Sequence, residues 1–294
     1  MTSRGSDSQP RPAHAAGTIA VGSYTVHRLG FGAMRLAGKG IWGDASDRVG
    51  AMRVLRRAVE LGVDFIDTAD AYGPATNETL IADTLHPYPA GLVIATKGGL
   101  VRPGPGDWER DGRPEHLRDA CEASLTRLRT DCIDLYQLHA PDPSVPIEDS
   151  LGELARLQAE GKLRHVGVSN FDVEQLERGR RIVEIVSVQN RYNVEDRSSE
   201  DVLEWCERNR VAFIPWFPLG AGDHTKPTGT DEAVQRLAAL AQRHGITLAQ
   251  AALAWLLAKS PAILPIPGTS SLAHLEENVA AASLELDPAE LRGI

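Results

Sequence analysis

From residue 29 onward, the chain alternates short apolar runs with stretches of helical periodicity. The runs that we interpret as strands lie at 31–34, 65–68, 92–96, 133–138, 165–168, 185–188, 212–216 and 262–266. After the first run, apolar residues recur at the spacing of one helix face: Ala51, Val54, Leu55 and Ala58. Short apolar runs that alternate with amphipathic helices are typical of βα units. The pattern therefore predicts an α/β fold with a single closed (β/α)8, or TIM, barrel.

The N-terminal part of the chain shows a different pattern. Residues 1–17 are rich in Ser, Pro, Arg and Gly and show no apolar periodicity, so we expect a disordered tail followed by a barrel domain over residues 18–294. The barrel domain begins with a weakly alternating segment around Gly22 and Ser23. Apolar residues flank this turn on both sides, which predicts a β-hairpin that caps the bottom of the barrel.

Two connections between the predicted elements are longer than the few residues that usually join them. Residues 98–113 follow the third strand, and residues 218–230 follow the seventh. The carboxyl ends of all strands of a (β/α)8 barrel lie on one rim, where binding sites form. Both connections are therefore candidate loops for a substrate or a cofactor.

Composition narrows the classes of partner. The 294 residues include 31 Lys and Arg against 40 Asp and Glu, a net charge of -9, without a basic cluster that could follow a nucleic-acid backbone. The three cysteines show neither CxxC nor Cys/His metal spacing. No stretch reaches the roughly 18 apolar residues of a membrane span. We expect a cytoplasmic protein that binds no nucleic acid, membrane or metal, and its oligomeric state stays open.

Side chains able to share protons follow three consecutive predicted strands. Asp67 ends the second strand, and Tyr72 lies in the turn after it. Lys97 ends the third strand, and His139 follows the fourth. Each residue has an ordinary interpretation on its own, as a turn cap, a rim aromatic, a surface lysine or a packed loop histidine. A barrel, however, brings these strand ends together, which favours an active site. We interpret Asp70 as a turn residue.

These residues, together with several short motifs, resemble the aldo-keto reductase family over nearly the whole chain after the tail. The motifs occur in the order of the family: LGFG at 29–32, DTADAYG at 67–73, ATK at 95–97, LH at 138–139, GVSNF at 167–171, QN at 189–190, PLG at 218–220, IPGT at 266–269 and EEN at 276–278. The resemblance implies an oxidoreductase that reduces aldehydes or ketones with NADPH. It also implies a catalytic tetrad of Asp67, Tyr72, Lys97 and His139.

Such a tetrad permits hydride transfer with a general acid. A free phenol has a pKa of about 10. We expect the Lys97 cation, held charged by Asp67, to lower the pKa of Tyr72 so that this residue can donate a proton. An imidazole N–H of His139 can orient the carbonyl and share the developing oxyanion. The resemblance implies that the hydride comes from a nicotinamide.

The resemblance further implies a set of cofactor-binding residues. Ser169, Asn170 and Gln189 look like the polar residues that hold the carboxamide, and Trp216 like the aromatic residue stacked on the nicotinamide. Two of these assignments have alternatives, because Ser169 and Asn170 could cap a helix and Trp216 could belong to the core. The remaining implied residues are Pro218, Leu219, Gly220, Gly268, Thr269, Ser270, Ser271, His274, Glu277 and Asn278.

The chain departs from the family pattern at the phosphate site. The best NADPH binders of the family carry a lysine where this chain has Gly268 and an arginine where it has His274. Hydroxyl groups at 269–271 and the dipole of the following helix remain for the phosphate. Because a charge-assisted hydrogen bond contributes roughly 1.5–3 kcal/mol, we expect NADPH to be favoured only modestly and NADH to be usable.

Met34, Trp42 and Trp108 lie in the first strand or the rim loops, and we expect them to line an apolar substrate pocket. Such a pocket favours aromatic or medium-chain aldehydes and ketones over charged sugars. The short segment after the last predicted helix suggests an open site with broad acceptance. Two other classes stay open: another (β/α)8 enzyme, such as an aldolase with a Schiff base at Lys97, and a regulatory subunit that only binds the cofactor.

Overall fold

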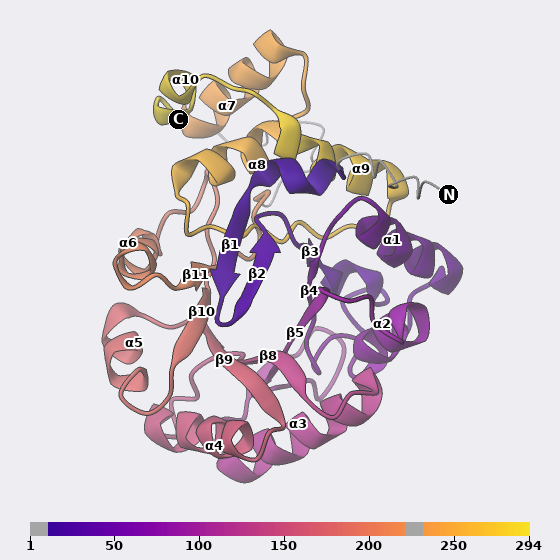
Figure 1. Cartoon of the computed structure of the whole chain (residues 1–294), viewed down its shortest axis with the longest axis vertical. Coiled ribbons are helices and arrows are strands. Elements are labelled where there is room, and N and C mark those ends of the chain that lie inside the picture. The colour runs from indigo at the N-terminus through magenta and orange to yellow at the C-terminus, as the bar shows by residue number, and fades with distance from the viewer. Residues whose placement is uncertain (1–10, 221–231) are drawn as a thin grey trace, which may run out of the picture.

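One curled parallel sheet forms the centre of the computed structural model, which describes residues 11–220 and 232–294. Its strands follow the order β11-β10-β9-β8-β5-β4-β3, and helices surround the sheet on the outside (Figure 1). The strands are β3 (Phe31–Gly32), β4 (Phe65–Asp67), β5 (Val93–Gly98), β8 (Ile133–Leu138), β9 (Leu163–Ser169), β10 (Ile185–Gln189) and β11 (Ala212–Phe213). The architecture is the (β/α)8 barrel that the alternating pattern predicts.

The barrel closes through an extended segment and not through a regular eighth strand. Residues 262–267 bind both edge strands, since Gly30 N donates to Pro265 O at 2.9 Å and Leu264 N donates to Phe213 O at 2.9 Å. The prolines at 265 and 267 have no N–H group, so the hydrogen-bond ladder cannot continue. The prediction of a regular strand at 262–266 is therefore wrong, although this segment takes the place of that strand.

Capping side chains set where several helices begin. Asp47 caps the first helix by accepting a hydrogen bond from Gly50 N, and capping boxes begin two later helices at Asp172 and Thr247. The helices are α1 (Arg48–Glu60), α2 (Thr76–Leu85), α3 (Pro114–Leu128), α4 (Ile147–Ala159), α5 (Val173–Gly179), α6 (Glu200–Asn209), α7 (Glu232–His244), α8 (Leu248–Lys259), α9 (Leu272–Ala280) and α10 (Pro288–Arg292). Within the described ranges, none of them is long and apolar enough to cross a membrane. The cytoplasmic location stays a prediction.

The predicted N-terminal hairpin is present and covers one end of the barrel. It consists of β1 (Thr18–Val21) and β2 (Tyr24–His27), which pair antiparallel and cross the centre of the barrel in the view of Figure 1. Val21 and Val26 are fully buried and pack with the side chains that fill the barrel interior. The hairpin therefore closes the bottom, and a site can open only at the opposite end.

The segment just before the hairpin is ordered, contrary to the prediction of a disordered tail through residue 17. Residues Pro12–Ala16 form a 3-10 helix, η1. Ala13 is fully buried, and its N–H donates to Leu61 O at 3.1 Å. The only buried residues of this helix are two small alanines, Ala13 and Ala16. The sequence therefore shows no apolar periodicity that would predict the helix. Residues 1–10 lie outside the described residues.

The rim carries short elements that the sequence pattern did not predict. Within the long connection after β5, β6 (Leu100–Val101) and β7 (Glu109–Arg110) pair antiparallel. A 3-10 helix, η2 (Ala33–Leu36), begins directly after β3, so Met34 belongs to this helix and not to the first strand. Of the other predicted rim loop, residues 221–230 lie outside the described part of the chain.

Candidate active site

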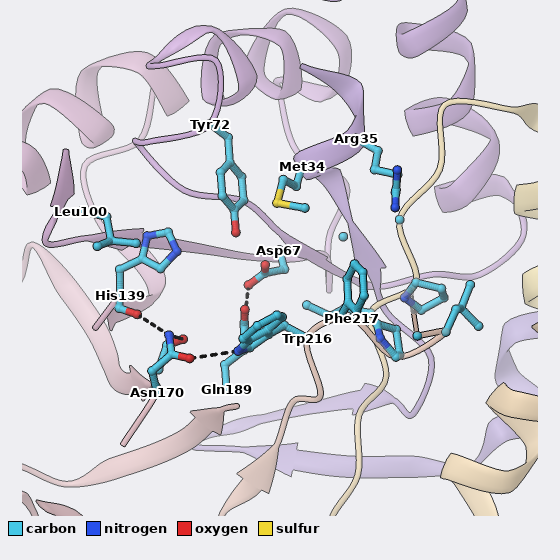
Figure 2. A pocket seen from close by; sticks show the side chains of 18 of the residues that line it. Met34, Arg35, Asp67, Tyr72, Leu100, His139, Asn170, Gln189, Trp216 and Phe217 are labelled. Carbon is cyan, nitrogen blue, oxygen red and sulfur yellow. Dashed lines mark hydrogen bonds between the residues drawn. The ribbon is translucent and has the colours of Figure 1, made fainter. Parts of the chain in front are cut away.

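A cavity of about 430 Å³ opens at the carboxyl ends of the strands (Figure 2). The residues predicted for catalysis and substrate binding that line it are Met34, Asp67, Tyr72, Trp108 and His139. The residues predicted for the cofactor that line it are Ser169, Asn170, Gln189, Trp216, Pro218, Leu219, Gly220 and Gly268. The cavity is also lined by residues that the sequence patterns did not indicate, namely Gly32, Arg35, Leu100, Phe217, Ile266 and Pro267. Three of them, Arg35, Phe217 and Pro267, directly adjoin a predicted residue, and this neighbourhood could have indicated them.

Lys97 and Asp67 meet beneath the floor of this cavity. Lys97 Nζ lies 2.6 Å from Asp67 Oδ1 and donates to Thr68 O at 2.8 Å. It also lies 3.5 Å from Tyr72 Oη. Lys97 is fully buried, at 0% exposure, so its charge reaches the cavity through Tyr72.

His139 faces Tyr72 across the floor of the cavity (Figure 2). The two ring centroids are 5.8 Å apart, and the rings stand edge to face. The His139 Nδ1 atom is buried and has no hydrogen-bond partner among the described residues. The barrel thus brings together the four residues that the sequence analysis placed in a tetrad.

Burial is the largest single influence on the pKa values of Lys97, Tyr72 and His139. It lowers the pKa of Lys97, but Asp67 and Tyr72 outweigh this effect, so the pKa of Lys97 lies above its ordinary value. Burial raises the pKa of Tyr72 and outweighs Lys97, which lowers it. The expected net decrease of the Tyr72 pKa is therefore wrong for the protein without a cofactor. Burial, with a smaller effect of the Lys97 charge, lowers the pKa of His139 well below its ordinary value, so the imidazole is neutral at pH 7.

Two glutamines hold the Asp67 carboxylate from the side opposite Lys97. Gln189 Nε2 donates to Asp67 Oδ2 at 2.9 Å, and Gln137 Nε2 donates to the same oxygen at 3.2 Å. Gln189 is among the predicted residues, whereas Gln137 is not. Gln137 could have been found from its position, because it lies two residues after Leu135 on the strand face that points into the barrel. The glutamines fix the carboxylate so that its other oxygen faces the lysine.

Asn170 joins two parts of the cavity wall. Its Nδ2 donates to His139 O at 3.0 Å, and its Oδ1 accepts from Trp216 Nε1 at 3.1 Å (Figure 2). Its backbone is left-handed (φ 62°), a conformation that asparagine tolerates. The helix that follows is capped by Asp172, so Ser169 and Asn170 are not its cap. Trp216 is partly exposed and lines the cavity, which is also not a core position.

A second cavity, of about 410 Å³, lies between α7, α8 and α9 and shares Gly268 with the first. Thr269, His274, Glu277 and Asn278 line it, as the resemblance implies for the phosphate and adenine end. Ser271 accepts a hydrogen bond from His274 N and caps α9. Ser270 is exposed and lines neither cavity. The two cavities adjoin at Gly268 and together have room for an elongated ligand.

Gly268 has a steric reason to lack a side chain. A Cβ atom at this position would lie 2.4 Å from Gly32 O, a backbone atom at the end of β3. The backbone at Gly268 therefore lies directly against the end of β3. The absence of the family lysine at position 268 goes together with this close approach.

Of the three residues predicted to contact the substrate, two line the first cavity and one does not. Met34 and Trp108 line the first cavity, but Trp42 does not. The Trp42 ring lies instead beside Arg102, whose Cζ atom is 5.7 Å from the ring centroid. Sequence reasoning could place Trp42 in a rim loop, but not decide which way its ring points.

Comparisons with known proteins agree with this geometry. The model of the aldo/keto reductase family matches residues 28–294. An uncharacterised oxidoreductase of Schizosaccharomyces pombe is 46% identical over 93% of this chain and 87% of its own length. Pyridoxine 4-dehydrogenase of Escherichia coli is 40% identical over 92% and 95% of the two chains. The structure of an aldo-keto reductase from Klebsiella pneumoniae in complex with NADPH is 28% identical and has a TM-score of 0.77, over 94% and 93% of the two chains. The sequence motifs, the barrel and these matches together show that the chain belongs to the aldo/keto reductase family.

Proposed function

We propose that the protein reduces aldehydes and ketones to alcohols with NADPH, and that Tyr72 is the general acid. The observation that carries the proposal is the chain of contacts from Asp67 through Lys97 to Tyr72, which ends at the cavity. Membership of the aldo/keto reductase family supports an oxidoreductase that acts on carbonyl groups.

The proposed chemistry follows from the protonation of the four residues. A nicotinamide cofactor, when bound, would supply the hydride that the carbonyl carbon receives. Tyr72 donates its proton to the carbonyl oxygen, and the Lys97 cation 3.5 Å away stabilises the phenolate that remains. Asp67 keeps Lys97 charged in its buried position. Neutral His139 donates an N–H group to the same carbonyl oxygen and orients it.

Two observations support NADPH as the cofactor. The two adjoining cavities together have room for an elongated ligand such as a dinucleotide, and the similar Klebsiella pneumoniae enzyme is solved in complex with NADPH. Because positions 268 and 274 carry neither lysine nor arginine, the proposed preference over NADH is modest. Dissociation constants for both cofactors test this, and NADH binding that equals or exceeds NADPH binding would overturn the preference.

Aromatic aldehydes are the proposed substrate class. Met34, Leu100 and Trp108 give the cavity an apolar wall beside Tyr72 and His139. One of the similar proteins is a pyridoxine 4-dehydrogenase, and oxidation of an alcohol group of pyridoxine gives a flat aromatic aldehyde. Pyridoxal is therefore the first substrate to test.

A substrate panel followed by nicotinamide absorbance tests the proposed function. Pyridoxal, benzaldehyde, butanal and a charged sugar phosphate would each be added to protein saturated with NADPH. We expect oxidation of NADPH with the three aldehydes and little with the sugar phosphate. Protein that binds NADPH but oxidises it with none of these compounds would overturn the proposal and favour a regulatory subunit.

The alternative of an aldolase with a Schiff base at Lys97 has little structural support. A Schiff base requires a neutral and accessible amine, whereas Lys97 Nζ is buried and paired with Asp67. We expect no covalent adduct at Lys97 when borohydride is added in the presence of an aldehyde.

A further inference from the structure

Arg102 lies in the connection after β6, where its side chain reaches two aromatic rings beside the cavity. Its Cζ atom is 3.9 Å from the centroid of the Trp108 ring and 5.7 Å from the centroid of the Trp42 ring. Only 8% of Arg102 is exposed, although the surrounding loop is rich in proline and glycine. Contacts between a guanidinium and an indole are strongest where little water surrounds them. Arg102 therefore links the loop that carries Trp42 to the loop that carries Trp108.

The same guanidinium donates hydrogen bonds to backbone carbonyls of three separate segments. Nε donates to Asp107 O at 2.7 Å, and Nη2 donates to Gly40 O at 3.1 Å. Nη1 donates to Ile41 O at 3.1 Å and makes a longer contact of 3.5 Å with Ala71 O. The acceptors in these described bonds are neutral carbonyls, so the side chain ties backbone to backbone.

Three of these carbonyls belong to the residues at 41, 71 and 107, which directly precede Trp42, Tyr72 and Trp108. A carbonyl shares its rigid peptide plane with the next residue, so a fixed carbonyl orients the next Cα atom. The Trp108 ring in turn stands edge to face with Tyr72 and with His139, and both centroid distances are 6.4 Å. Arg102 thus contacts the backbone carbonyls directly before Trp108, which lines the cavity, and before Tyr72, the proposed general acid.

We infer that Arg102 is a positioning residue that holds Trp108 as one wall of the cavity and thereby sets its fit to aromatic aldehydes. The inference rests on the proposed reductase function. An aromatic ring in the cavity contacts Trp108, whereas acetaldehyde at Tyr72 and His139 is too small to depend on that wall. Lysine cannot replace Arg102, because its ammonium group donates from one point and not from a planar fork.

The test compares Arg102→Lys with a matched control, Arg28→Lys. Arg28 also donates to backbone carbonyls, those of Leu257, Ser260 and Ile263, but it precedes β3 at the opposite end of the barrel. Both variants keep the positive charge and remove a guanidinium bridge. Each would be measured with benzaldehyde and with acetaldehyde at saturating NADPH, together with the dissociation constant of NADPH.

We expect Arg102→Lys to raise the KM for benzaldehyde about five- to tenfold, as the loss of an aromatic contact suggests. The KM for acetaldehyde and the NADPH dissociation constant should stay within about twofold of the wild type, because neither depends on Trp108, and the contact of Arg102 with the carbonyl before Tyr72 is its longest, at 3.5 Å. Arg28→Lys should change none of these constants. An equal loss for both aldehydes, or constants that match those of Arg28→Lys, would overturn the inference.

Backbone amide exchange separates this inference from the proposed function. In Arg102→Lys, residues 38–43 and 99–110 should exchange faster than in the wild type, whereas Arg28→Lys should speed exchange only around residues 257–263. Unchanged exchange at 38–43 and 99–110 overturns the inference whether or not the protein is active. If the wild type reduces no aldehyde, the proposed function fails, and the exchange measurement still decides whether Arg102 holds the two loops.

Discussion

At the scale of single residues, burial and one ion pair decide which protons the site can move. The raised pKa of Tyr72 keeps its phenol protonated at pH 7, as a proton donor requires. The lowered pKa of His139 keeps its imidazole neutral, so it can donate a hydrogen bond without competing as an acid. The proposed roles of the two residues are therefore distinguished by their surroundings.

Replacement of Tyr72 by phenylalanine removes only the hydroxyl group that the mechanism uses. General acids typically contribute about 10²- to 10⁴-fold to a rate, so we expect Tyr72→Phe to lower kcat for pyridoxal by at least about a hundredfold. The NADPH dissociation constant, measured by fluorescence titration, should change less than about twofold because the ring remains. A residual kcat above about one hundredth of the wild-type value would argue against Tyr72 as the general acid.

Removal of one partner of the buried ion pair should destabilise the protein strongly. Lys97→Met leaves the Asp67 carboxylate buried without its cation, and we expect the free energy of unfolding to fall by about 3–5 kcal/mol. The double variant Asp67→Asn with Lys97→Met leaves no charge behind and should recover part of this loss. As a control, Arg208→Met removes an exposed pair with Glu204 and should cost less than about 1 kcal/mol. Urea unfolding checks all three, and a double variant less stable than Lys97→Met would contradict the explanation.

At the scale of elements, the segment at residues 262–267 closes the barrel and leads into Gly268, which lines both cavities. It replaces a strand because its prolines interrupt the ladder, yet it binds β3 and β11 on its two sides. At its end it approaches β3 so closely that a Cβ atom at position 268 would lie 2.4 Å from Gly32 O. One short segment therefore closes the barrel and ends where the two cavities adjoin.

A pair of glycine substitutions tests this close approach. Gly268→Ala places a Cβ atom 2.4 Å from Gly32 O, and we expect a loss of about 1–3 kcal/mol in the free energy of unfolding. Gly152 lies inside α4 with no atom within 4 Å of an added Cβ, so Gly152→Ala should stabilise the protein by about 0.5–1 kcal/mol. Thermal or urea unfolding measures both changes. If Gly268→Ala were as stable as Gly152→Ala, the close approach would not be a constraint.

At the scale of the whole molecule, histidines held neutral make the fold sensitive to acid. Burial is the largest cause that lowers the pKa of His139, and it also lowers the pKa of His14 and His165. The unfolded chain takes up these protons below the ordinary pKa of about 6.5, but the folded protein does not. Their contribution to stability is therefore present above that pH and is lost as the pH falls towards the folded-state values.

Replacement of the most strongly affected histidine should make the stability less dependent on pH. Between about pH 6.5 and 5.5, we expect the free energy of unfolding of His139→Asn to fall by about 1 kcal/mol less than that of the wild type. Urea titrations at both pH values give the comparison, and equal slopes for His139→Asn and the wild type would exclude His139 as a source of acid sensitivity.

Local patterns were enough to predict the barrel, the hairpin cap and a group of proton-sharing side chains at the rim, whereas the assignment of a tetrad came from the resemblance to the family. Apolar runs and helix periodicity depend on neighbouring residues, and the positions of Asp67, Lys97 and His139 at strand ends follow from them. Local patterns failed where burial involves very few side chains, as in the 3-10 helix at residues 12–16. They also failed at residues 262–266, where backbone donors decide whether a segment is a strand.

The contacts that tune the site were decided only by the tertiary structure. Gln137 and Asp67 are 70 positions apart in sequence, and Arg102 and Gly40 are 62 apart, yet each pair is joined by a hydrogen bond. Nothing in a proline- and glycine-rich loop indicates that its arginine is buried, because the rings and carbonyls around it come from other segments. The sequence by itself determines which chemical groups reach the rim of the barrel. Closure of the barrel and packing of its loops determine which of these groups touch, because such contacts depend on long-range geometry that no local pattern records.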